Sequence, residues 1–174
     1  MMFGRISGTL AALLLASGLA SAQSAKPTDP QIAHIAYTAG QIDIEAAQQA
    51  LQKSNNKDVR DFATGMERDH KAVNDQALAL VKKLKVTPED NDTSKALSKQ
   101  AADKRAELAK LSGAAFDKAY IDNEVAYHKT VNAALADTLI PSANNQELKE
   151  LLTTGLKIFQ GHEQHAEHVA AEFK

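Results

Sequence analysis

Residues 56–85 read NKDVRDFATGMERDHKAVNDQALALVKKLK, and their pattern sets the architecture of the chain. Every third or fourth position carries a side chain suited to a buried stripe: Val59, Ala63, Met66, His70, Val73, Ala77, Leu80 and Leu84. A spacing that alternates between four and three residues places these side chains along one side of a single long α-helix. A helix with so long an apolar stripe needs helical partners of similar length to cover it.

Three other long segments carry stripes of the same kind, and a shorter one lies between them. We predict long helices over residues 30–53, 114–140 and 145–173 and a shorter helix over residues 93–111. No segment alternates with period two for long enough to form a strand. The shorter helix can carry the chain back toward the start of residues 56–85. The pattern therefore predicts an all-α, ferritin-like four-helix bundle with one extra, shorter crossover helix, in which residues 56–85 and 114–140 run parallel.

The first residues have the features of an export signal. Arg5 precedes a short apolar run, and Ala20-Ser21-Ala22 forms a small-x-small cleavage site. We expect residues 1–22 to be a signal peptide cleaved after Ala22, residues 23–29 a polar leader and residues 30–174 the helical domain. The mature protein is then periplasmic or secreted, and we expect no transmembrane segment in it because no later segment is apolar enough.

The composition excludes several classes of protein. The chain of 174 residues has 20 Lys and Arg against 22 Asp and Glu, a net charge of −2 that argues against nucleic-acid binding. It contains no Cys, so it has no disulfide, no thiolate metal ligand and no thiol nucleophile. A domain of this size can fold around its apolar core without a cofactor.

Three histidines interrupt the apolar stripes. His70, His128 and His162 occupy core-type positions on three different predicted helices. His70 lies 14 residues after Asn56 and His128 lies 14 residues after Ala114, so the two rings are at one level if these helices run parallel. The motif HKAVN at residues 70–74 also returns as HKTVN at residues 128–132. His162 lies within about one turn of the same level on the antiparallel last helix. We therefore expect the three imidazoles to converge inside the bundle.

Carboxylates accompany these histidines. Glu67 precedes His70 by three residues, Glu124 precedes His128 by four, and Glu45 lies on the first predicted helix. Bundle proteins with two metal ions use Glu side chains and two Glu-x-x-His pairs, but this chain has only the pair at Glu67. The candidate metal ligands are His70, His128, His162, Glu67, Glu45 and Glu124. Imidazole and carboxylate ligands suit Zn, Fe, Cu or Ni, and the sequence does not choose among them.

Other interpretations of the same residues stay open. The histidines can instead be neutral core residues held by Asn74, Asn132, Tyr127 or a carboxylate, or they can serve acid–base catalysis. Asp69 is expected to be an exposed helix charge, and His168, at the end of His162-x-x-His165-x-x-His168, is expected to face solvent. Residues 93–111 carry a net charge of +3 and are a candidate face for a partner protein.

The chain resembles a known family over about residues 31–169. The resemblance rests on Phe62-Ala63-x-x-Met66-x-x-Asp69-His70-x-x-x-Asn74, Leu111-Ser112-Gly113-x-x-Phe116-Asp117-x-x-Tyr120, His128 and Leu156-x-x-Phe159-x-x-His162-x-x-His165-Ala166. These motifs are similar to those of the domain-of-unknown-function 4142 family of exported bacterial proteins, which are grouped with ferritin-like bundles. The resemblance implies that His70, His128 and His162 occupy motif positions, and it implies no reaction. Lys157 stands where that family usually has Pro, so no kink is expected there.

The sequence thus favours an exported, non-enzymatic bundle that acts as a binding or stress-protective envelope protein. A metal-binding or metal-dependent oxidoreductase bundle with a His/Glu site in the core is the alternative. The partner is unknown, with an envelope protein or a second copy of the chain as candidates.

Overall fold

The computed structural model describes residues 26–173, which form helices joined by short loops. The elements are α1 (Asp29–Lys53), α2 (Lys57–Leu84), α3 (Asp92–Ala109), α4 (Gly113–Ala134), the π-helical turn η1 (Leu135–Leu139), α5 (Ile140–Ser142) and α6 (Gln146–Ala171). No strand occurs within residues 26–173, so the all-α prediction is confirmed. The predicted signal peptide, residues 1–22, lies outside the described residues. None of the described helices is long and apolar enough to span a membrane.

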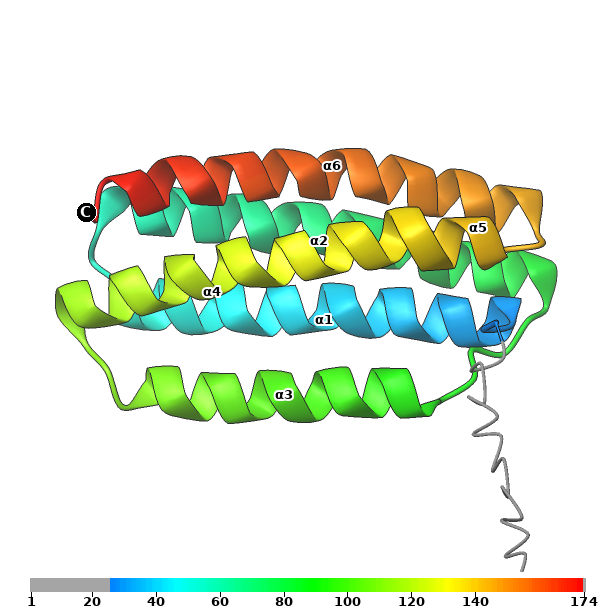
Figure 1. Cartoon of the computed structure of the whole chain (residues 1–174), viewed down its shortest axis with the longest axis horizontal. Coiled ribbons are helices and arrows are strands. Elements are labelled where there is room, and N and C mark those ends of the chain that lie inside the picture. The colour runs from blue at the N-terminus through cyan, green and yellow to red at the C-terminus, as the bar shows by residue number, and fades with distance from the viewer. Residues whose placement is uncertain (1–25, 174) are drawn as a thin grey trace, which may run out of the picture.

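The long helices lie side by side, and α3 lies along one edge of them. The closest packing joins α1 to α2 and α4 to α6, and α2 also packs on α6. In Figure 1, α2 and α4 run in the same direction, while α3 returns the chain past α1 from the end of α2 to the start of α4. This arrangement places corresponding positions of α2 and α4 at the same level.

Asparagine side chains start three of the helices. The Asn56 side chain accepts hydrogen bonds from the backbone of Asp58 and Val59, and Asn145 accepts one from Leu148. Asn91 accepts a hydrogen bond from the backbone of Ser94 in a reciprocal capping box. These caps satisfy amide groups that lack partners in the first turn of a helix. They fix where each helix begins, and therefore the level of every residue along it.

The third long helix continues past the residue expected to end it. Pro141 lies inside α5, and the helix ends only at Ser142. The turn before Pro141 is π-helical, so the backbone amide of Ile140 bonds to the carbonyl of Leu135, five residues earlier. Because the π turn shifts the hydrogen-bond pattern, we infer that it accommodates a proline that has no amide hydrogen to donate. The helix predicted over residues 114–140 therefore continues through Pro141, and the prediction that it ends before this proline was wrong.

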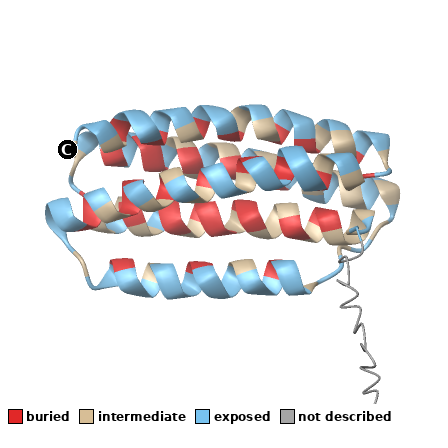
Figure 2. Cartoon of the chain, viewed as in Figure 1, coloured by how far each residue is buried: buried red, intermediate tan, exposed pale blue. Residues whose placement is uncertain are grey.

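The buried residues, coloured red in Figure 2, include two apolar clusters. One cluster includes Ala47, Val59, Phe62, Met66, Leu108, Phe116, Tyr120, Ile121 and Val169. The other includes Ile32, Ile35, Leu135, Leu139, Leu148, Leu152 and Phe159. Buried polar side chains lie between the clusters: Asp43, His70, Glu124, His128 and His162. The polar layer is therefore enclosed by apolar packing on both sides.

One glycine allows α1 and α2 to approach closely beside this layer. A Cβ at Gly40 would overlap the Asn74 amide oxygen and lie 3.1 Å from the Asn74 Cγ. Asn74 is buried, and its amide nitrogen donates to the carbonyl of Tyr37 at 3.3 Å. The position at Gly65 on α2 is different, because a Cβ there meets nothing within 4 Å.

We predict opposite effects for two glycine substitutions. Gly40→Ala should lower the free energy of unfolding by about 1–3 kcal/mol, because it displaces the buried Asn74 amide or separates the helices. Gly65→Ala should raise it by roughly 0.5–1 kcal/mol, because alanine reduces the entropy of the unfolded chain and meets no obstacle. Urea denaturation measures both. Equal effects at the two positions would contradict the described contact between α1 and α2.

Candidate metal site

Three histidine rings from three helices meet in the polar layer. The ring centroids of His70 on α2 and His128 on α4 lie 5.8 Å apart, and those of His70 and His162 on α6 lie 5.2 Å apart. The centroids of His128 and His162 are separated by 5.7 Å. One ring nitrogen from each residue lies within 4.8 Å of the other two. The structure thus brings together the three rings that the helix levels predict to converge.

His128 presents one fixed nitrogen to this cluster. Its Nδ1 lies 2.9 Å from the backbone carbonyl oxygen of Glu124. Because a carbonyl oxygen only accepts hydrogen bonds, Nδ1 carries the proton and Nε2 keeps its lone pair. Nε2 is buried and has no hydrogen-bond partner among residues 26–173. A lone pair is therefore available in the interior at this position.

His162 is held in a similar way by a carboxylate. Its Nε2 donates to Asp69 Oδ2 at 3.1 Å, and the buried Nδ1 has no partner in the described part of the chain. The Arg68 guanidinium, and then His162, hold the pKa of Asp69 below its ordinary value, so this carboxyl group stays ionised. Asp69 was expected to be an exposed charge, but its side chain is only 27% exposed. It lies one turn of α2 before Val73, on the flank of the helix that faces α6, where it reaches His162.

His70 is the least satisfied of the three. Neither ring nitrogen has a hydrogen-bond partner among the residues described. Nε2 lies 3.5 Å from Asp43 Oδ2, and both side chains are almost fully buried. The ring stacks on Phe159 with centroids 4.5 Å apart and planes 9° apart. Phe159 therefore orients the His70 ring without satisfying either nitrogen.

Two buried carboxyl groups lie next to the histidines. Oxygens of Asp43 on α1 and Glu124 on α4 lie within 4.8 Å of each other and of a His128 ring nitrogen. Burial, followed by the charge of Glu124, raises the pKa of Asp43 well above its ordinary value. Burial also raises the pKa of Glu124 to about 7. Metal-free protein therefore keeps at least one proton on this pair near neutral pH.

The histidines are neutral over the same range of pH. Burial lowers the pKa of His70 well below its ordinary value, and the neighbouring His128 and His162 lower it further. Burial lowers the pKa of His128 to about 4, and it also lowers the pKa of His162. Neutral imidazole is the form that binds metal ions. The ring nitrogens are therefore ready to act as ligands without losing a proton.

The structure separates the predicted carboxylate ligands. Glu124 joins the cluster, but Glu45 is 39% exposed and pairs with Arg105 at 2.7 Å. Glu67 accepts a hydrogen bond from Gln48 at 3.0 Å and pairs with Lys71 at 2.6 Å, away from the rings. Both lie on helix faces turned away from the centre of the bundle. The site is therefore built from fewer glutamates than the sequence pattern proposed.

The polar side chains expected to hold the histidines bind elsewhere. Asn74 donates to the carbonyl of Tyr37, Asn132 donates to Glu163 at 2.7 Å, and Tyr127 donates to the carbonyl of Ala39 at 3.3 Å. Buried polar atoms nearly always have a hydrogen-bond partner. These three residues therefore do not partner the ring nitrogens. The carboxylate that was the other expected partner is present at His162, whose Nε2 donates to Asp69.

Sequence reasoning missed Asp43. It focused on Glu45, two residues further along the same helix, although Asp43 lies four residues from both Ala39 and Ala47 in the buried stripe. An acidic residue at a core position was the available signal. Asp43 is buried because α1 is covered by α2 on one side and by α3 and α4 on others.

Comparison with known families identifies the chain. The model of the family described as Domain of unknown function (DUF4142) matches residues 15–169, nearly the whole chain. The chain therefore belongs to this family. No curated protein and no solved structure matches it.

We predict that Glu124→Gln changes how the stability of metal-free protein depends on pH. The pKa of Glu124 is about 7 in the folded protein against an ordinary value of 4.5. The protonated side chain therefore contributes fully to the free energy of unfolding below about pH 4.5, and this contribution is lost as the pH rises through about 7. Glutamine cannot ionise, so the variant should gain on the order of 2 kcal/mol relative to wild type between pH 5 and pH 8. Urea denaturation at both pH values, with chelator present, measures this gain.

Glu45→Gln is the matched control on a carboxyl group that is exposed. It should give the same difference from wild type at both pH values. A pH-independent effect of Glu124→Gln, or an equal pH-dependent effect of Glu45→Gln, would contradict the burial described for Glu124.

Proposed function

We propose that this DUF4142 protein is an exported, non-enzymatic bundle that binds a divalent transition-metal ion through His70, His128 and His162. The observation that carries the proposal is the convergence of the three rings: one nitrogen from each residue lies within 4.8 Å of the other two, and each ring has at least one buried nitrogen without a hydrogen-bond partner among residues 26–173. Leaving a buried polar atom without a partner costs about 1–3 kcal/mol, and here several such atoms share one place. A metal ion would satisfy all three nitrogens at once.

The distances are suitable for contraction around an ion. A tetrahedral zinc site with bonds of about 2.0–2.1 Å places its nitrogens roughly 3.3 Å apart. The ring nitrogens therefore need to approach one another by less than about 2 Å, which side-chain rotation supplies. Three histidines leave a fourth position for a water molecule or a carboxylate, and Asp43 is near enough to His70 to provide one.

The groups behind the rings support the same proposal. Histidine ligands usually donate their second ring N–H to a carboxylate or a backbone carbonyl, which fixes the tautomer. Asp69 has this role behind His162, and the Glu124 carbonyl has it behind His128. The Asp69 carboxylate and the Glu124 carbonyl oxygen are therefore already placed to orient their rings.

The buried carboxyl pair can offset the positive charge of a bound ion, and the imidazole ligands define the class of ion. Three neutral imidazoles leave the charge of a divalent cation uncompensated in a buried layer, and ionisation of Asp43 or Glu124 offsets it. Imidazole nitrogen favours Zn, Cu, Ni or Fe, whereas Mg and Ca favour sites made of oxygen ligands. The proposed ion is therefore a transition metal.

We also propose a ferritin-like architecture and an exported location for this chain. The parallel course of α2 and α4, with α3 between them in sequence, supports a ferritin-like four-helix bundle with a crossover helix. The pattern of residues 1–22 supports export to the periplasm or the outside of the cell. An exported bundle that holds a metal ion is suited to sequestering it in the envelope.

A metal-dependent oxidoreductase is the second candidate, and one observation favours it. Phe159 separates His70 from an apolar pocket, so a bound ion would lie close to a molecule in that pocket. Copper-loaded protein distinguishes the two functions, since turnover of an added reductant under air is expected only for the oxidoreductase.

We predict that chelator-treated protein binds one equivalent of Zn²⁺ or Co²⁺. At a free concentration 100-fold above the dissociation constant, the ion should add about 2.7 kcal/mol to the free energy of unfolding and raise the melting temperature by about 5–10 °C. Isothermal titration and thermal melting measure these effects, and Co²⁺ absorption reports the geometry of its ligands.

The matched variants are His128→Ala in the cluster and His168→Ala, an exposed residue of α6. His128→Ala should abolish stoichiometric binding and the rise in melting temperature, whereas His168→Ala should leave both unchanged. Binding that survives in His128→Ala, or is lost in His168→Ala, would contradict the proposed ligands.

A further prediction concerns the carboxylate behind His162. Asp69→Asn should weaken metal binding by about 10–100-fold, because an amide orients the ring less strongly and leaves its Nδ1 less basic. Asp61→Asn, on the exposed face of α2, is the control and should leave the affinity unchanged. Titration of both variants with Zn²⁺ measures their affinities. Equal affinities would show that the hydrogen bond from His162 to Asp69 does not strengthen metal binding.

A further inference from the structure

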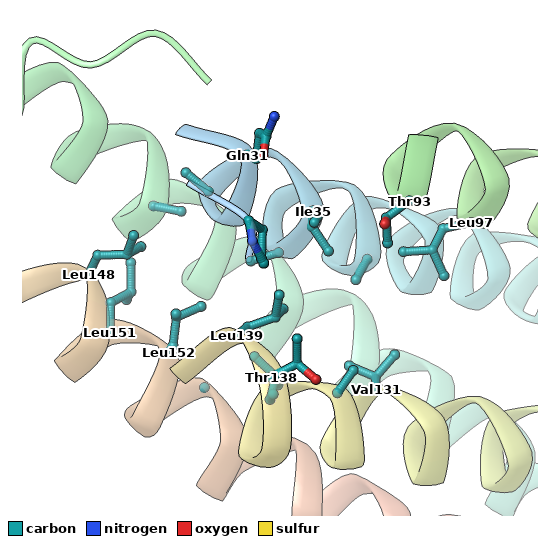
Figure 3. Close-up of a pocket in the computed structure, with 18 of the residues that line it drawn as sticks. Gln31, Ile35, Thr93, Leu97, Val131, Thr138, Leu139, Leu148, Leu151 and Leu152 are labelled. Carbon is teal, nitrogen blue, oxygen red and sulfur yellow. The ribbon is translucent and has the colours of Figure 1, made fainter. Parts of the chain in front are cut away.

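A large pocket lies beside the polar layer, toward the end of the bundle where α1 and α6 begin. Its volume is about 560 Å³, and α1, α2, α3, α4, η1 and α6 all contribute to its wall. Figure 3 shows Ile35, Thr93 and Leu97 on one side and Val131 and Thr138 on the other. We propose that this pocket binds a neutral molecule with a single aliphatic chain and a small polar head.

The pocket exists because small side chains line it. These are Ala33, Ala36, Ala39, Ala77, Ala134 and Gly155. Residues of the α2 stripe beyond His70, including Val73, Ala77 and Leu80, are only partly buried because they face this space. Protein interiors are close-packed and rarely contain voids larger than a water molecule. A volume of this size within an apolar stripe is typical of a ligand site between the helices of a bundle.

The shape of the pocket favours a chain. Leu148 and Phe159 both line it and lie 11 residues apart on α6, which is about 16 Å along a helix. The wall along this length is apolar, with leucines from α2, α3, η1 and α6. An elongated apolar space of this kind fits an extended alkyl chain better than a compact ring system.

The π-helical turn that accommodates Pro141 also forms part of the pocket wall. Leu135, Thr138 and Leu139, all in η1, line the pocket. Single π turns within α-helices are rare and occur frequently at functional sites. This one widens the helix where it faces the pocket.

The polar residues of the pocket define the head of the ligand. Gln31, Asn91 and Thr93 offer uncharged polar groups, and Asp92 and Thr93 are exposed, which places the mouth at the start of α3. Within residues 26–173, no Lys, Arg or His lines the pocket, and Asp92 is its only charged lining residue. An anionic head would meet a carboxylate and no cation, so a neutral head is favoured over an anionic one.

The inner end of the pocket receives the tail. Phe159 closes it there, with its ring stacked on His70, and the amide nitrogen of the neighbouring Asn74 is engaged by the carbonyl of Tyr37. The polar lining residues nearest this end, Asn74 and Thr130, donate to the backbone carbonyls of Tyr37 and Ala126, so the wall there is mainly apolar and aromatic. The ligand therefore enters tail first and keeps its head among Gln31, Asn91 and Thr93.

The test uses the neutral fluorescent probe N-phenyl-1-naphthylamine with chelator-treated protein, so its outcome does not depend on metal binding. We expect saturable fluorescence enhancement with one site per chain and displacement of the probe by 1-dodecanol. Absence of saturable binding, or failure of dodecanol to displace the probe, would overturn the proposal.

Matched variants locate the probe. The double variant Ala36→Leu, Ala77→Leu fills the pocket and should weaken probe binding at least tenfold, with the helical circular dichroism retained. The double variant Ala72→Leu, Ala79→Leu places the same side chains on the exposed face of α2 and should bind as wild type does. Equal affinity of the two double variants would show that the probe binds elsewhere.

A second arm tests the head on wild-type protein and so does not depend on the folding of a variant. Dodecanoate should displace the probe at least tenfold less effectively than 1-dodecanol at pH 8, and Asp92→Asn should reduce this difference. Equal displacement by the acid and the alcohol would overturn the assignment of a neutral head.

Discussion

The structure depends on burying imidazole nitrogens that its own side chains do not satisfy. Burying a polar group is unfavourable unless it finds a partner. Neither ring nitrogen of His70 has a hydrogen-bond partner among residues 26–173, and the nearest carboxyl oxygen, Asp43 Oδ2, lies 3.5 Å from Nε2. Phe159 holds one face of this ring, and apolar clusters enclose the polar layer on either side. A layer built in this way is stable only if the rest of the bundle is firmly packed, and the metal ion that we propose would complete it by accepting several lone pairs.

The connections between the helices place the three rings at one level. α3 lies along α1 and returns the chain, so α4 starts at the same end of the molecule as α2 and brings His128 level with His70. The asparagine caps then fix the start of α2 and α6, and with it the height of each ring. A change of register by a single residue would rotate an imidazole by about 100° out of the layer.

The repeating apolar positions were sufficient to predict the helices and the convergence of the rings, because both follow from helical periodicity. The outer members of the site could not be predicted in the same way. Asp43 and Asp69 reach the histidines from the flanks of their helices. Which flank of a helix is buried depends on the neighbouring helices, and the apolar stripe of one helix does not reveal them. Glu67 shows the converse, since its Glu-x-x-His spacing with His70 is correct but the glutamate pairs with Lys71 instead. The pocket could not be predicted from the sequence either. Ala77 and Leu80 occupy ordinary core positions of the stripe, and the pocket arises because the side chains that face them on other helices are small.

The central claim is that one ion is held by three imidazoles from three helices. X-ray absorption spectroscopy of zinc-loaded protein tests it most directly, because it counts the histidine ligands and measures their distances. The account predicts three imidazole nitrogens at about 2.0–2.1 Å in the wild type and a loss of one in His162→Ala. A coordination shell made of oxygen alone, or one that is unchanged in the variant, would contradict it.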